Sequence, residues 1–389
     1  MGGNVAFFIN GVGSLKGGGG AERFFADFFE QYITSDNHKF NLYYYIDKQS
    51  ISNLKEVGKL KNGKHIVNFN VISNRFKNRI EMLQMYFFIL FYNIKIIHIP
   101  LYNISYLPIL KSISKMPGLL RPKLAINIVN CYVAPALKDK KHPDHESIKN
   151  VYFPLFKDIN VDGFFCWNKL FEEYVIENKV FTKAPKNISS ISSRFSDTNK
   201  FFPEKEKKKQ IVFASRLDEQ KHPEWLVNAI IVIKNKFPEI ISDWKFIICG
   251  NGPLRNDLME LAKTNSLDDV LEFRIEGQMQ NILNYSKIYV SCQDYDNFPS
   301  LSMAEAMAAG NAIVARDVGQ TNLFLKDKIN GLIIHPDNTE GLIAVIYNLL
   351  SNEQSIDEMG KKSLESIKNV HTFENFVTQI ENFWYSLNN

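Results

Sequence analysis

The sequence predicts an α/β chain of two consecutive doubly wound domains. Short β-branched or aromatic runs alternate with longer helical periods, which is typical of parallel sheets covered by helices. The polar run at residues 203–210 (PEKEKKKQ) separates two such series and predicts a solvated linker. A length of 389 residues suits two or three domains. We therefore expect one domain at residues 1–198, a second at 199–371 and a final helix at 372–389.

The first half contains seven runs that predict strands. They lie at residues 5–9, 41–46, 66–71, 94–99, 124–129, 163–166 and 188–191. Between the first two, residues 21–32 place aromatic side chains at three- and four-residue spacing, which predicts an amphipathic helix. Helices between successive strands favour a parallel sheet.

The second half repeats this pattern with six strand runs. They lie at residues 211–214, 245–249, 271–275, 288–292, 312–315 and 332–334. Ligands of such sheets bind beyond the carboxyl ends of the strands, so the loops that follow them are where we expect chemistry. The apolar face of the final helix, with Phe376, Ile380 and Trp384, predicts that it docks on a domain surface.

Composition and charge exclude several classes of protein. A net charge of +4 with 23% charged residues does not suit a dedicated nucleic-acid binder, so we expect no nucleic-acid partner. Four widely spaced cysteines without a CxxC pair predict buried free thiols in a reducing compartment. The chain enters its first strand run without a signal-peptide pattern, so we expect a cytoplasmic protein.

Two cations follow the first strand of the second half. Arg216 lies just after that strand, and Lys221 comes shortly before a helix that begins near Pro223. Fixed positive charge beside the free N–H groups of a helix start suits a diphosphate. The alternative is a pair of ordinary surface cations in a polar loop.

A glycine-rich turn follows the second strand of this half. Gly250, Asn251 and Gly252 precede Pro253, which opens a helix. Glycines let a backbone approach a ligand closely. The same pattern also suits a tight turn with no ligand.

Residues 291–310 (SCQDYDNFPSLSMAEAMAAG) form the most informative segment. A buried strand leads into a polar loop, Pro299 and Ser300 begin a helix, and Glu305 follows among small apolar residues. The amides at residues 300–302 can hold a phosphate, while Glu305 can bind the vicinal hydroxyls of a ribose. A nearby arginine is the alternative partner for Glu305.

In combination these motifs resemble the donor-binding domain of retaining glycosyltransferases of family 4, which have the GT-B fold. The resemblance rests on RLxxxK (216–221), GNGP (250–253), NFPSLSMAEAMAAGNAIVA (297–315), Gly319 and the Asn330–Gly331 pair. GGGGAERF (17–24) resembles the family's first glycine-rich turn. The resemblance implies two Rossmann-like domains that face each other across a cleft, with the C-terminal helix crossing back.

The resemblance also implies roles for individual residues. Arg216 and Lys221 would stabilise the donor diphosphate, Glu305 would bind the ribose, and Gly19 and Gly20 would approach the diphosphate from the opposite side of the cleft. The donor would be a substrate, a UDP- or GDP-sugar, with no cofactor and no metal. The other implied donor-binding residues are Gly250, Asn251, Gly252, Asn297, Phe298, Pro299, Ser300, Leu301 and Ser302.

Two departures from the family pattern leave positions open. The loop before Glu305 is one residue longer, so the group that meets the donor sugar is Asp296, Asn297 or Asp294, and we favour Asp296. Where many members carry a histidine near the reacting sugar, this chain has Asn130; His98 after the preceding strand is a candidate substitute, or a buried structural residue.

The resemblance implies sugar transfer with retention to a hydroxyl of a glycan or lipid-linked acceptor, in bacterial surface polysaccharide or glycoconjugate assembly. The departing phosphate could accept the acceptor's proton. The apolar run at residues 82–92 predicts either a core helix or a peripheral contact with a membrane. Cations flank this run and the next helical region: Arg75, Lys77, Arg79, Lys111, Lys115, Arg121 and Lys123.

Two other functions remain as alternatives. A non-catalytic GT-B scaffold that binds a nucleotide sugar or glycan would explain the departures from the motif. A nicotinamide-dependent oxidoreductase would use Gly11, Gly13 and Gly17 after the first strand, with Asp47 on a ribose. However, Asp47 lies well beyond the spacing of about 20 residues expected for that role.

Overall fold

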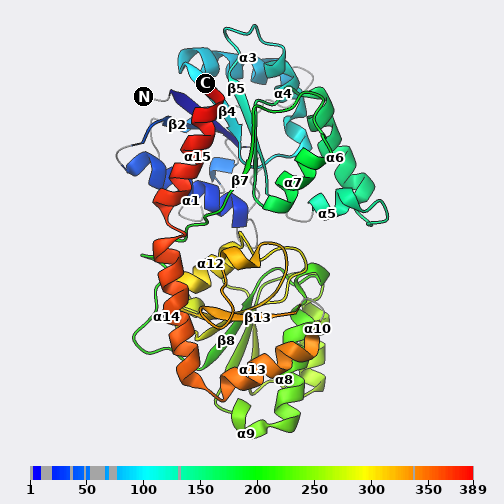
Figure 1. Ribbon diagram of the computed structural model, residues 1–389, viewed down its shortest axis with the longest axis vertical. Helices are drawn as coiled ribbons and strands as arrows, with labels where there is room; N and C mark the ends of the chain where they lie inside the picture. The colour runs from blue at the N-terminus through cyan, green and yellow to red at the C-terminus, as the bar shows by residue number, and fades with distance from the viewer. Residues whose placement is uncertain are drawn as a thin grey trace. The chain divides into compact units, whose positions relative to one another are not determined.

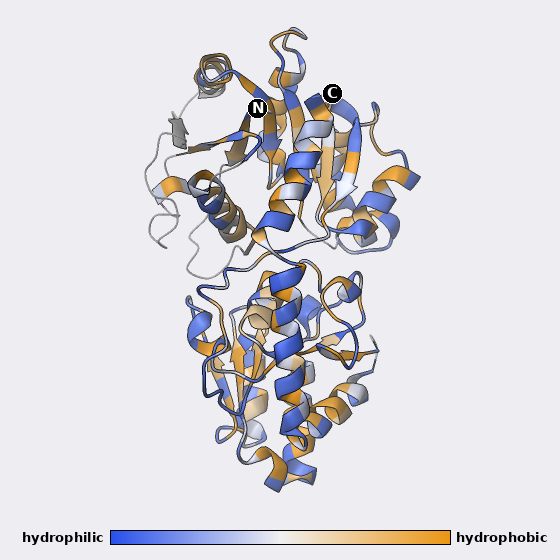
Figure 2. Ribbon diagram, turned by 60° about the vertical axis from the view of Figure 1, so that its left-hand side comes forward, coloured by the Kyte–Doolittle hydropathy of each residue, from blue (hydrophilic) through white to orange (hydrophobic). Residues whose placement is uncertain are grey.

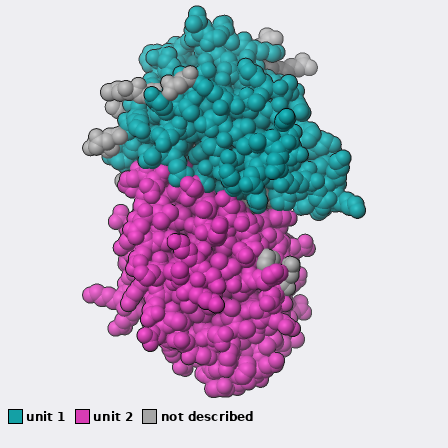
Figure 3. Space-filling view, viewed as in Figure 1, with its two compact units in different colours: residues 1–191, 377–389 teal, residues 192–376 magenta. Residues whose placement is uncertain are grey.

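The computed structural model describes residues 3–9, 20–35, 38–47, 50–52, 66–69, 77–129, 133–335 and 338–388. The chain divides into two compact units (Figure 3). Unit 1 comprises Met1–Ile191 with Val377–Asn389, and unit 2 comprises Ser192–Phe376. The boundary between the units lies after Ile191, whereas we expected it after residue 198. Phe195 belongs to unit 2, where its ring packs against Phe373 and Phe376 at 5.2 and 5.7 Å between centroids.

Unit 1 is built on a parallel sheet whose described strands run in the order β3-β2-β1-β4-β5-β6-β7 (Figure 1). Neighbouring strands pair in parallel throughout. The strands are β1 Asn4–Ile9, β2 Asn41–Asp47, β3 Ile66–Phe69, β4 Ile94–Ile99, β5 Lys123–Ile128, β6 Gly163–Cys166 and β7 Asn187–Ser190.

Helices cover this sheet. They include α1 Gly20–Thr34, α3 Lys77–Phe91, η1 Ile104–Tyr106, α4 Leu107–Ser114, α5 Val133–Lys138, α6 His145–Asp158 and α7 Lys169–Glu177. Residues of α3 to α7 share one apolar cluster with the strands, while the aromatic rings of α1 pack on Phe7 of β1. The aromatic stripe expected on the first helix lies on α1, where Phe25, Phe28 and Phe29 are fully buried. Each strand–helix repeat thus follows the pattern that the sequence predicts.

The last helix, α15 Phe373–Asn388, completes unit 1. Trp384 is fully buried, and its Nε1 donates to Nδ1 of His98 at 2.8 Å. Glu381 accepts hydrogen bonds from the Tyr32 hydroxyl at 2.7 Å and from the Lys39 amide at 2.9 Å. The helix approaches so closely that a Cβ at Gly163 would lie 2.7 Å from the side chain of Leu387.

Unit 2 has a second parallel sheet, with the order β10-β9-β8-β11-β12-β13 among its described strands. The strands are β8 Gln210–Ala214, β9 Lys245–Cys249, β10 Leu271–Arg274, β11 Ile288–Ser291, β12 Ala312–Arg316 and β13 Gly331–Ile334. The order reverses between β8 and β11, and such a reversal opens a crevice beyond the carboxyl ends of the two strands.

The helices of unit 2 turn apolar sides toward the sheet. In Figure 2 the outward side of α14 is hydrophilic, while the strands behind it are hydrophobic. The helices are η2 Glu219–Lys221, α8 Pro223–Lys236, α9 Pro238–Ile241, α10 Arg255–Thr264, α11 Gln280–Leu283, α12 Leu301–Ala308, η3 Thr321–Leu323, α13 Thr339–Leu350 and α14 Glu353–Asn369. Both units are therefore Rossmann-like α/β units, as expected.

The segment expected to be a solvated linker is partly anchored. Lys207 is largely buried, and its Nζ donates to the carbonyl oxygens of Ser286 at 2.6 Å and Gly310 at 2.8 Å. Burial lowers the pKa of Lys207 to about 7. The interpretation of this lysine as solvated is wrong, because carbonyl acceptors distant in the sequence surround it only in the folded chain.

Helix α3 is apolar on two sides. Phe88 and Ile89 face the core, whereas Phe87 and Phe91 are exposed and stack on each other at 5.5 Å. None of the described helices combines the length and the apolar character that a membrane crossing requires.

Candidate functional site

A small open pocket lies at the carboxyl ends of β8 and β11, the two strands between which the order of the second sheet reverses. Its position is the one that doubly wound sheets use for ligands. The lining residues belong to unit 2 alone: Phe213, Ser215, Lys221, Tyr289, Val290, Ser291, Cys292, Gln293, Ser300 and Ser302.

Lys221 supplies the positive charge of this pocket. It ends the short helix η2, and its Nζ donates to Oε1 of Gln293 in the loop after β11. The Asp294 amide donates to the Gln220 carbonyl at 3.0 Å and ties the two loops together. The ammonium group is thereby held beside the pocket.

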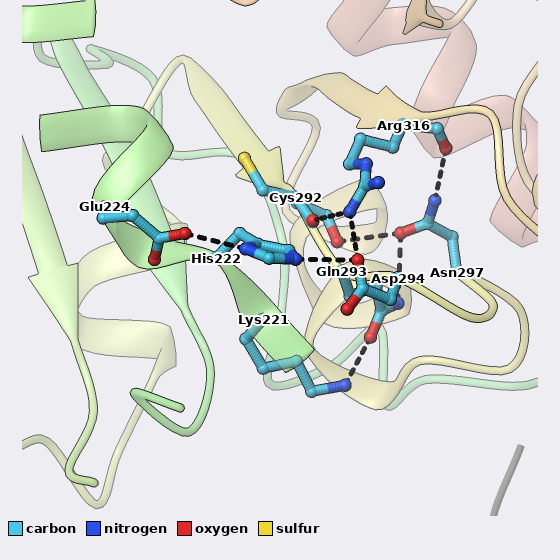
Figure 4. A network of polar contacts seen from close by, with 9 residues as sticks. Lys221, His222, Glu224, Cys292, Gln293, Asp294, Asn297 and Arg316 are labelled. Atoms are coloured by element: carbon cyan, nitrogen blue, oxygen red, sulfur yellow. Dashed lines mark hydrogen bonds and ion pairs between the residues drawn. The ribbon is translucent and has the colours of Figure 1, made fainter. Parts of the chain in front are cut away.

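A charged network fixes the same two loops (Figure 4). His222, at a positive φ of 48°, places Nδ1 2.7 Å from Glu224 and Nε2 2.7 Å from Asp294. Arg316 at the end of β12 donates to Asp294 at 2.6 Å, and its guanidinium lies 4.4 Å from the centre of the Trp225 ring. Because Asp294 contacts both His222 and Arg316, the loop after β11 is held against the start of α8.

Arg216 lies outside the pocket lining. Its side chain is 72% exposed, and Nε is 3.3 Å from a carboxylate oxygen of Asp218. Arg216 is only two residues beyond β8, and its neighbour Ser215 does line the pocket. The structure therefore brings Lys221 and the start of α12 together, while the Arg216 side chain points into solvent.

The glycines of the GNGP turn approach backbone atoms. A Cβ at Gly250 would lie 1.9 Å from the carbonyl oxygen of Ser215, and one at Gly252 would lie 2.2 Å from that of Leu217. The Leu217 amide also donates to the carbonyl of Asn251, whose side chain is exposed. The glycines thus shape the loop that carries Arg216; contact with a ligand at these positions stays a prediction.

The amino end of α12 forms one wall of the pocket. Ser300 caps the helix, accepting from the Met303 amide at 3.4 Å, and Leu301 begins it. The Tyr289 hydroxyl bonds to the Ala214 carbonyl at 3.2 Å and to the Ser302 hydroxyl at 2.8 Å. The unpaired first-turn amides of a helix carry partial positive charge, so this wall favours an anion.

Glu305 lies one turn into α12 and is half-buried. Burial raises the pKa of the Tyr289 hydroxyl, and the negative charge of Glu305 adds to that rise. Glu305 is therefore close enough to the pocket wall to act on it electrostatically. Phe298 and Pro299 precede the helix; Phe298 is fully buried and packs on Phe324 at 5.0 Å.

The three candidates for the sugar-contacting group differ in exposure. Asp296 is 4% exposed, and its Oδ1 accepts from the amides of Phe298 at 3.0 Å and Gln320 at 2.8 Å. Asn297 is fully buried and bonded at both ends of its amide. Only Asp294 keeps a partly exposed side chain, at 31%. The carboxyl group of Asp296 is thus enclosed by its own loop and by the loop that carries Gln320, and its expected contact with the sugar stays a prediction.

His98 is a buried residue of unit 1. It is fully buried, and burial lowers its pKa to about 4. Because Nδ1 accepts from Trp384, Nε2 carries the ring hydrogen and donates to Asn127 at 2.7 Å. Both ring nitrogens are occupied and no surface is left for a substrate, so the structural alternative holds and His98 is not a catalytic candidate.

Some of the expected site residues cannot be placed. Gly19 and Asn130 lie outside the described residues, as does Arg75, and Gly20 is known only as the first residue of α1. Of Lys77 and Arg79, the structure describes only the helical backbone. Their expected roles stay predictions.

The sequence did not single out Gln293, Tyr289 or Arg316. Gln293 directly follows a predicted strand, and this position could have marked it as a candidate site residue. Tyr289 and Arg316 lie within strands, where the pattern predicts only burial. Among the described residues, no three His, Cys, Asp or Glu side chains gather as a metal ion would require.

Part of the chain matches a known family of proteins. Residues 195–366 match the family described as glycosyl transferases group 1. A relative is the UDP-N-acetylglucosamine–peptide N-acetylglucosaminyltransferase GtfA subunit of Streptococcus agalactiae, 26% identical over 175 residues. That match covers 44% of this chain and 32% of the relative, so the chain spans about a third of its length.

Two solved structures resemble almost the whole chain. One is a TarM mutant of S. aureus in complex with Fondaparinux, alpha-GlcNAc-glycerol and UDP, with a TM-score of 0.71, 14% identity, and 98% and 99% of the two chains covered. The other is HepE of Anabaena in complex with UDP and glucose, with a TM-score of 0.71, 12% identity, and 97% and 98% covered. Residues 195–366 thus resemble the family of glycosyl transferases group 1, and the chain has the GT-B fold.

Proposed function

We propose that this chain transfers a sugar from a UDP- or GDP-sugar to a hydroxyl group of a glycan or lipid-linked acceptor, with retention of anomeric configuration. One observation carries the proposal: the pocket of unit 2 pairs the Lys221 ammonium with the amino end of α12 at the carboxyl ends of β8 and β11. Two independent sources of positive charge meet there, as a diphosphate requires.

In this proposal the donor diphosphate lies between Lys221 and the first turn of α12. Glu305, one turn further along, accepts hydrogen bonds from the ribose hydroxyls. Arg216 is exposed and paired only with Asp218, an interaction of small free energy at a surface, so it is free to turn toward the outer phosphate. The relatives named with UDP or UDP-N-acetylglucosamine support a uridine nucleotide.

The reaction breaks the bond between the anomeric carbon and the outer phosphate oxygen and forms a bond from that carbon to the acceptor oxygen. The acceptor attacks from the face that the diphosphate leaves, and its proton passes to the departing phosphate oxygen. No protein base is needed, which agrees with the burial of His98. Lys221, Arg216 and the α12 dipole stabilise the growing negative charge without a metal, each donor contributing about 3 kcal/mol.

For the donor sugar we propose Asp294 as the contacting group, because it is the exposed member of the three candidates. Its carboxylate is already fixed by His222 and Arg316. Asp294→Asn should weaken binding of the sugar nucleotide more than binding of the bare nucleotide. Equal weakening of both would assign Asp294 to loop structure alone.

The resemblance to the family supports a cytoplasmic role in bacterial surface polysaccharide or glycoconjugate assembly. The test is incubation with a panel of nucleotide sugars and hydroxyl acceptors, followed by NMR of the product's anomeric proton. We expect turnover of one donor with the configuration retained. An inverted product would rule out the mechanism.

A second candidate function is a non-catalytic scaffold that binds a nucleotide sugar. The enclosed carboxyl group of Asp296 and the buried imidazole of His98 favour it, since two expected catalytic groups are unavailable. Nucleotide binding without hydrolysis or transfer of any donor in the panel would establish this alternative.

A further inference from the structure

Unit 1 exposes an apolar surface that its own fold does not cover. Leu83, Phe87, Leu90 and Phe91 on α3 are each more than half exposed. Their spacing places them on one side of the helix, opposite Met85, Phe88 and Ile89, which face the core. Large patches of contiguous exposed apolar side chains usually mark an interaction site.

A second apolar element lies at the same end of unit 1. The loop between α4 and β5 carries Leu119, which is fully exposed, and Leu120, which is about half exposed. Helices α3 and α4 are neighbours, since the Tyr86 hydroxyl bonds to Ser112, and Figure 1 shows both at one end of the unit. We call the exposed side of α3 and this loop the apolar surface; its residues are Leu83, Phe87, Leu90, Phe91, Leu119 and Leu120.

Cations border the apolar surface. Lys95 follows α3, Lys115 caps the end of α4, and both are exposed with no ion pair to any described carboxylate. Lys123 begins β5 and pairs with Ile96, the residue after Lys95 on β4. Among the described residues that border the surface, cations outnumber carboxylates by five to two. The cations are Lys95, Lys111, Lys115, Arg121 and Lys123, and the carboxylates, Asp158 and Asp162, pair with three of them.

We infer that the apolar surface rests on a lipid bilayer that contains anionic lipids. The phenylalanines of α3 and the leucines of the loop enter the boundary between headgroups and acyl chains, while the surrounding lysines meet lipid phosphates. A protruding loop and a helix side can contact a flat partner together. A second copy of the chain fits less well, because a symmetric interface through this surface would bring like charges face to face.

The test uses the full chain with vesicles of phosphatidylcholine alone and of phosphatidylcholine mixed with phosphatidylglycerol. We expect the wild-type chain to float with the anionic vesicles and to dissociate as salt is raised. The Phe87→Ser/Phe91→Ser double variant should bind at least about tenfold more weakly, because each phenylalanine loses its apolar transfer free energy.

A matched control variant distinguishes binding through the apolar surface from nonspecific binding to vesicles. Ile176→Ser/Met259→Ser removes two exposed apolar side chains from other helices, α7 and α10, and should leave vesicle binding unchanged. Thermal unfolding of both double variants, with and without UDP, shows that each is folded. Vesicle binding needs neither donor nor acceptor, so it is measured separately from the proposed transfer reaction.

Two results would overturn the inference. One is a wild-type chain that stays with the soluble fraction, or a Phe87→Ser/Phe91→Ser variant that floats as well as the wild type does. The other is a wild-type dimer in sedimentation experiments, with the Phe87→Ser/Phe91→Ser variant monomeric and the control variant still dimeric. The second result would make the apolar surface an interface between two copies of the chain.

Discussion

Arg216 and Lys221 share one loop but meet different surroundings. Lys221 is bonded to Gln293 at the pocket, whereas Arg216 extends into solvent beside Asp218. Such an arrangement suits different roles. Lys221, whose ammonium group is held in place, binds the diphosphate in the ground state, whereas Arg216 can turn toward the diphosphate as negative charge builds on it during bond cleavage. The difference lies in side-chain placement and is open to direct test.

Replacement of Arg216 by alanine should therefore affect turnover more than binding. We expect kcat to fall by about 10²- to 10³-fold, because one donor to the developing charge is lost once Arg216 can no longer turn toward the outer phosphate. The dissociation constant for UDP should change by less than about threefold. Steady-state kinetics and calorimetry measure the two effects; Lys263→Ala, on the exposed side of α10, is the matched control. Loss of UDP affinity as large as the loss of kcat would contradict these separate roles.

Asp296 makes stability depend on pH. Burial raises the pKa of Asp296 to about 7, above its usual value of 3.8, and one of its carboxyl oxygens has no hydrogen-bond partner among the described residues. Since the folded-state pKa is the higher one, the neutral carboxyl stabilises the fold at low pH, and this contribution is lost as pH rises through about 7.

Asp296→Asn keeps the acceptor for the Phe298 and Gln320 amides and removes the ionisable group. At pH 8 the variant should be more stable than the wild type by about 1 to 3 kcal/mol, and near pH 3.5, where the carboxyl is largely neutral in both the folded and the unfolded chain, the two should be nearly equal. Denaturant unfolding at both pH values measures this. The exposed Asp268→Asn control should show no such pH dependence; an Asp296→Asn variant that is less stable at pH 8 would refute the explanation.

The sequence identified Arg216, Lys221 and Glu305 because they belong to a motif whose spacing survives in this chain. Among Asp294, Asp296 and Asn297 it favoured Asp296, on the alignment of Phe298 and Pro299 alone. Their roles depend on which backbone amides the folded loop turns toward each side chain, and those amides include Gln320, far along the chain. His98 was ambiguous for the same reason, because its partner Trp384 lies in the last helix.

Strands and helices were more predictable than single side chains. Residues 94–99, 163–166 and 245–249 are strands with the expected bounds, since a short apolar run between polar turns determines them locally. The anchoring of Lys207 and the two-sided character of α3 were not predictable. Both depend on which elements fold against them, and periodicity alone does not distinguish a covered side from an open one.

The turn after β9 offers a test of how an element shapes the site. Gly252→Ala would place a Cβ 2.2 Å from the Leu217 carbonyl oxygen. Because that oxygen belongs to the backbone, the loop itself would have to move. We expect a loss of about 1 to 3 kcal/mol in stability and weaker UDP binding, because the loop carrying Arg216 and Lys221 shifts. Thermal unfolding with and without UDP reports both.

Gly277→Ala is the matched control, because a Cβ there meets nothing within 4 Å. Its stability and UDP affinity should equal those of the wild type. If Gly252→Ala behaved like this control, the close approach of the two loops would have no functional consequence.

Considered as a whole, the chain returns to its first unit at its end. From Val377 onward α15 belongs to unit 1, where Trp384 and Glu381 bond to residues far away in sequence. The described residues that line the pocket, by contrast, all belong to unit 2. Stability of unit 1 and nucleotide binding by unit 2 should therefore be separable.

Trp384→Phe tests this separation. The variant keeps an aromatic ring but leaves Nδ1 of the buried His98 without its donor, and it vacates part of the space that the indole fills. We expect a loss of about 2 to 4 kcal/mol in the stability of unit 1. The rise in melting temperature that UDP gives to unit 2 should persist; its disappearance would show that the two functions are coupled.

The account as a whole depends on a diphosphate held by Lys221 and the first turn of α12. Calorimetric titration of UDP and of uridine into the wild-type chain and into Lys221→Ala tests this most directly. We predict that UDP binds the wild type at least about tenfold more tightly than it binds the variant, and that uridine binds both equally weakly. Equal UDP affinity in the two proteins, or no UDP binding in the wild type, would contradict the assignment of this pocket to a sugar nucleotide.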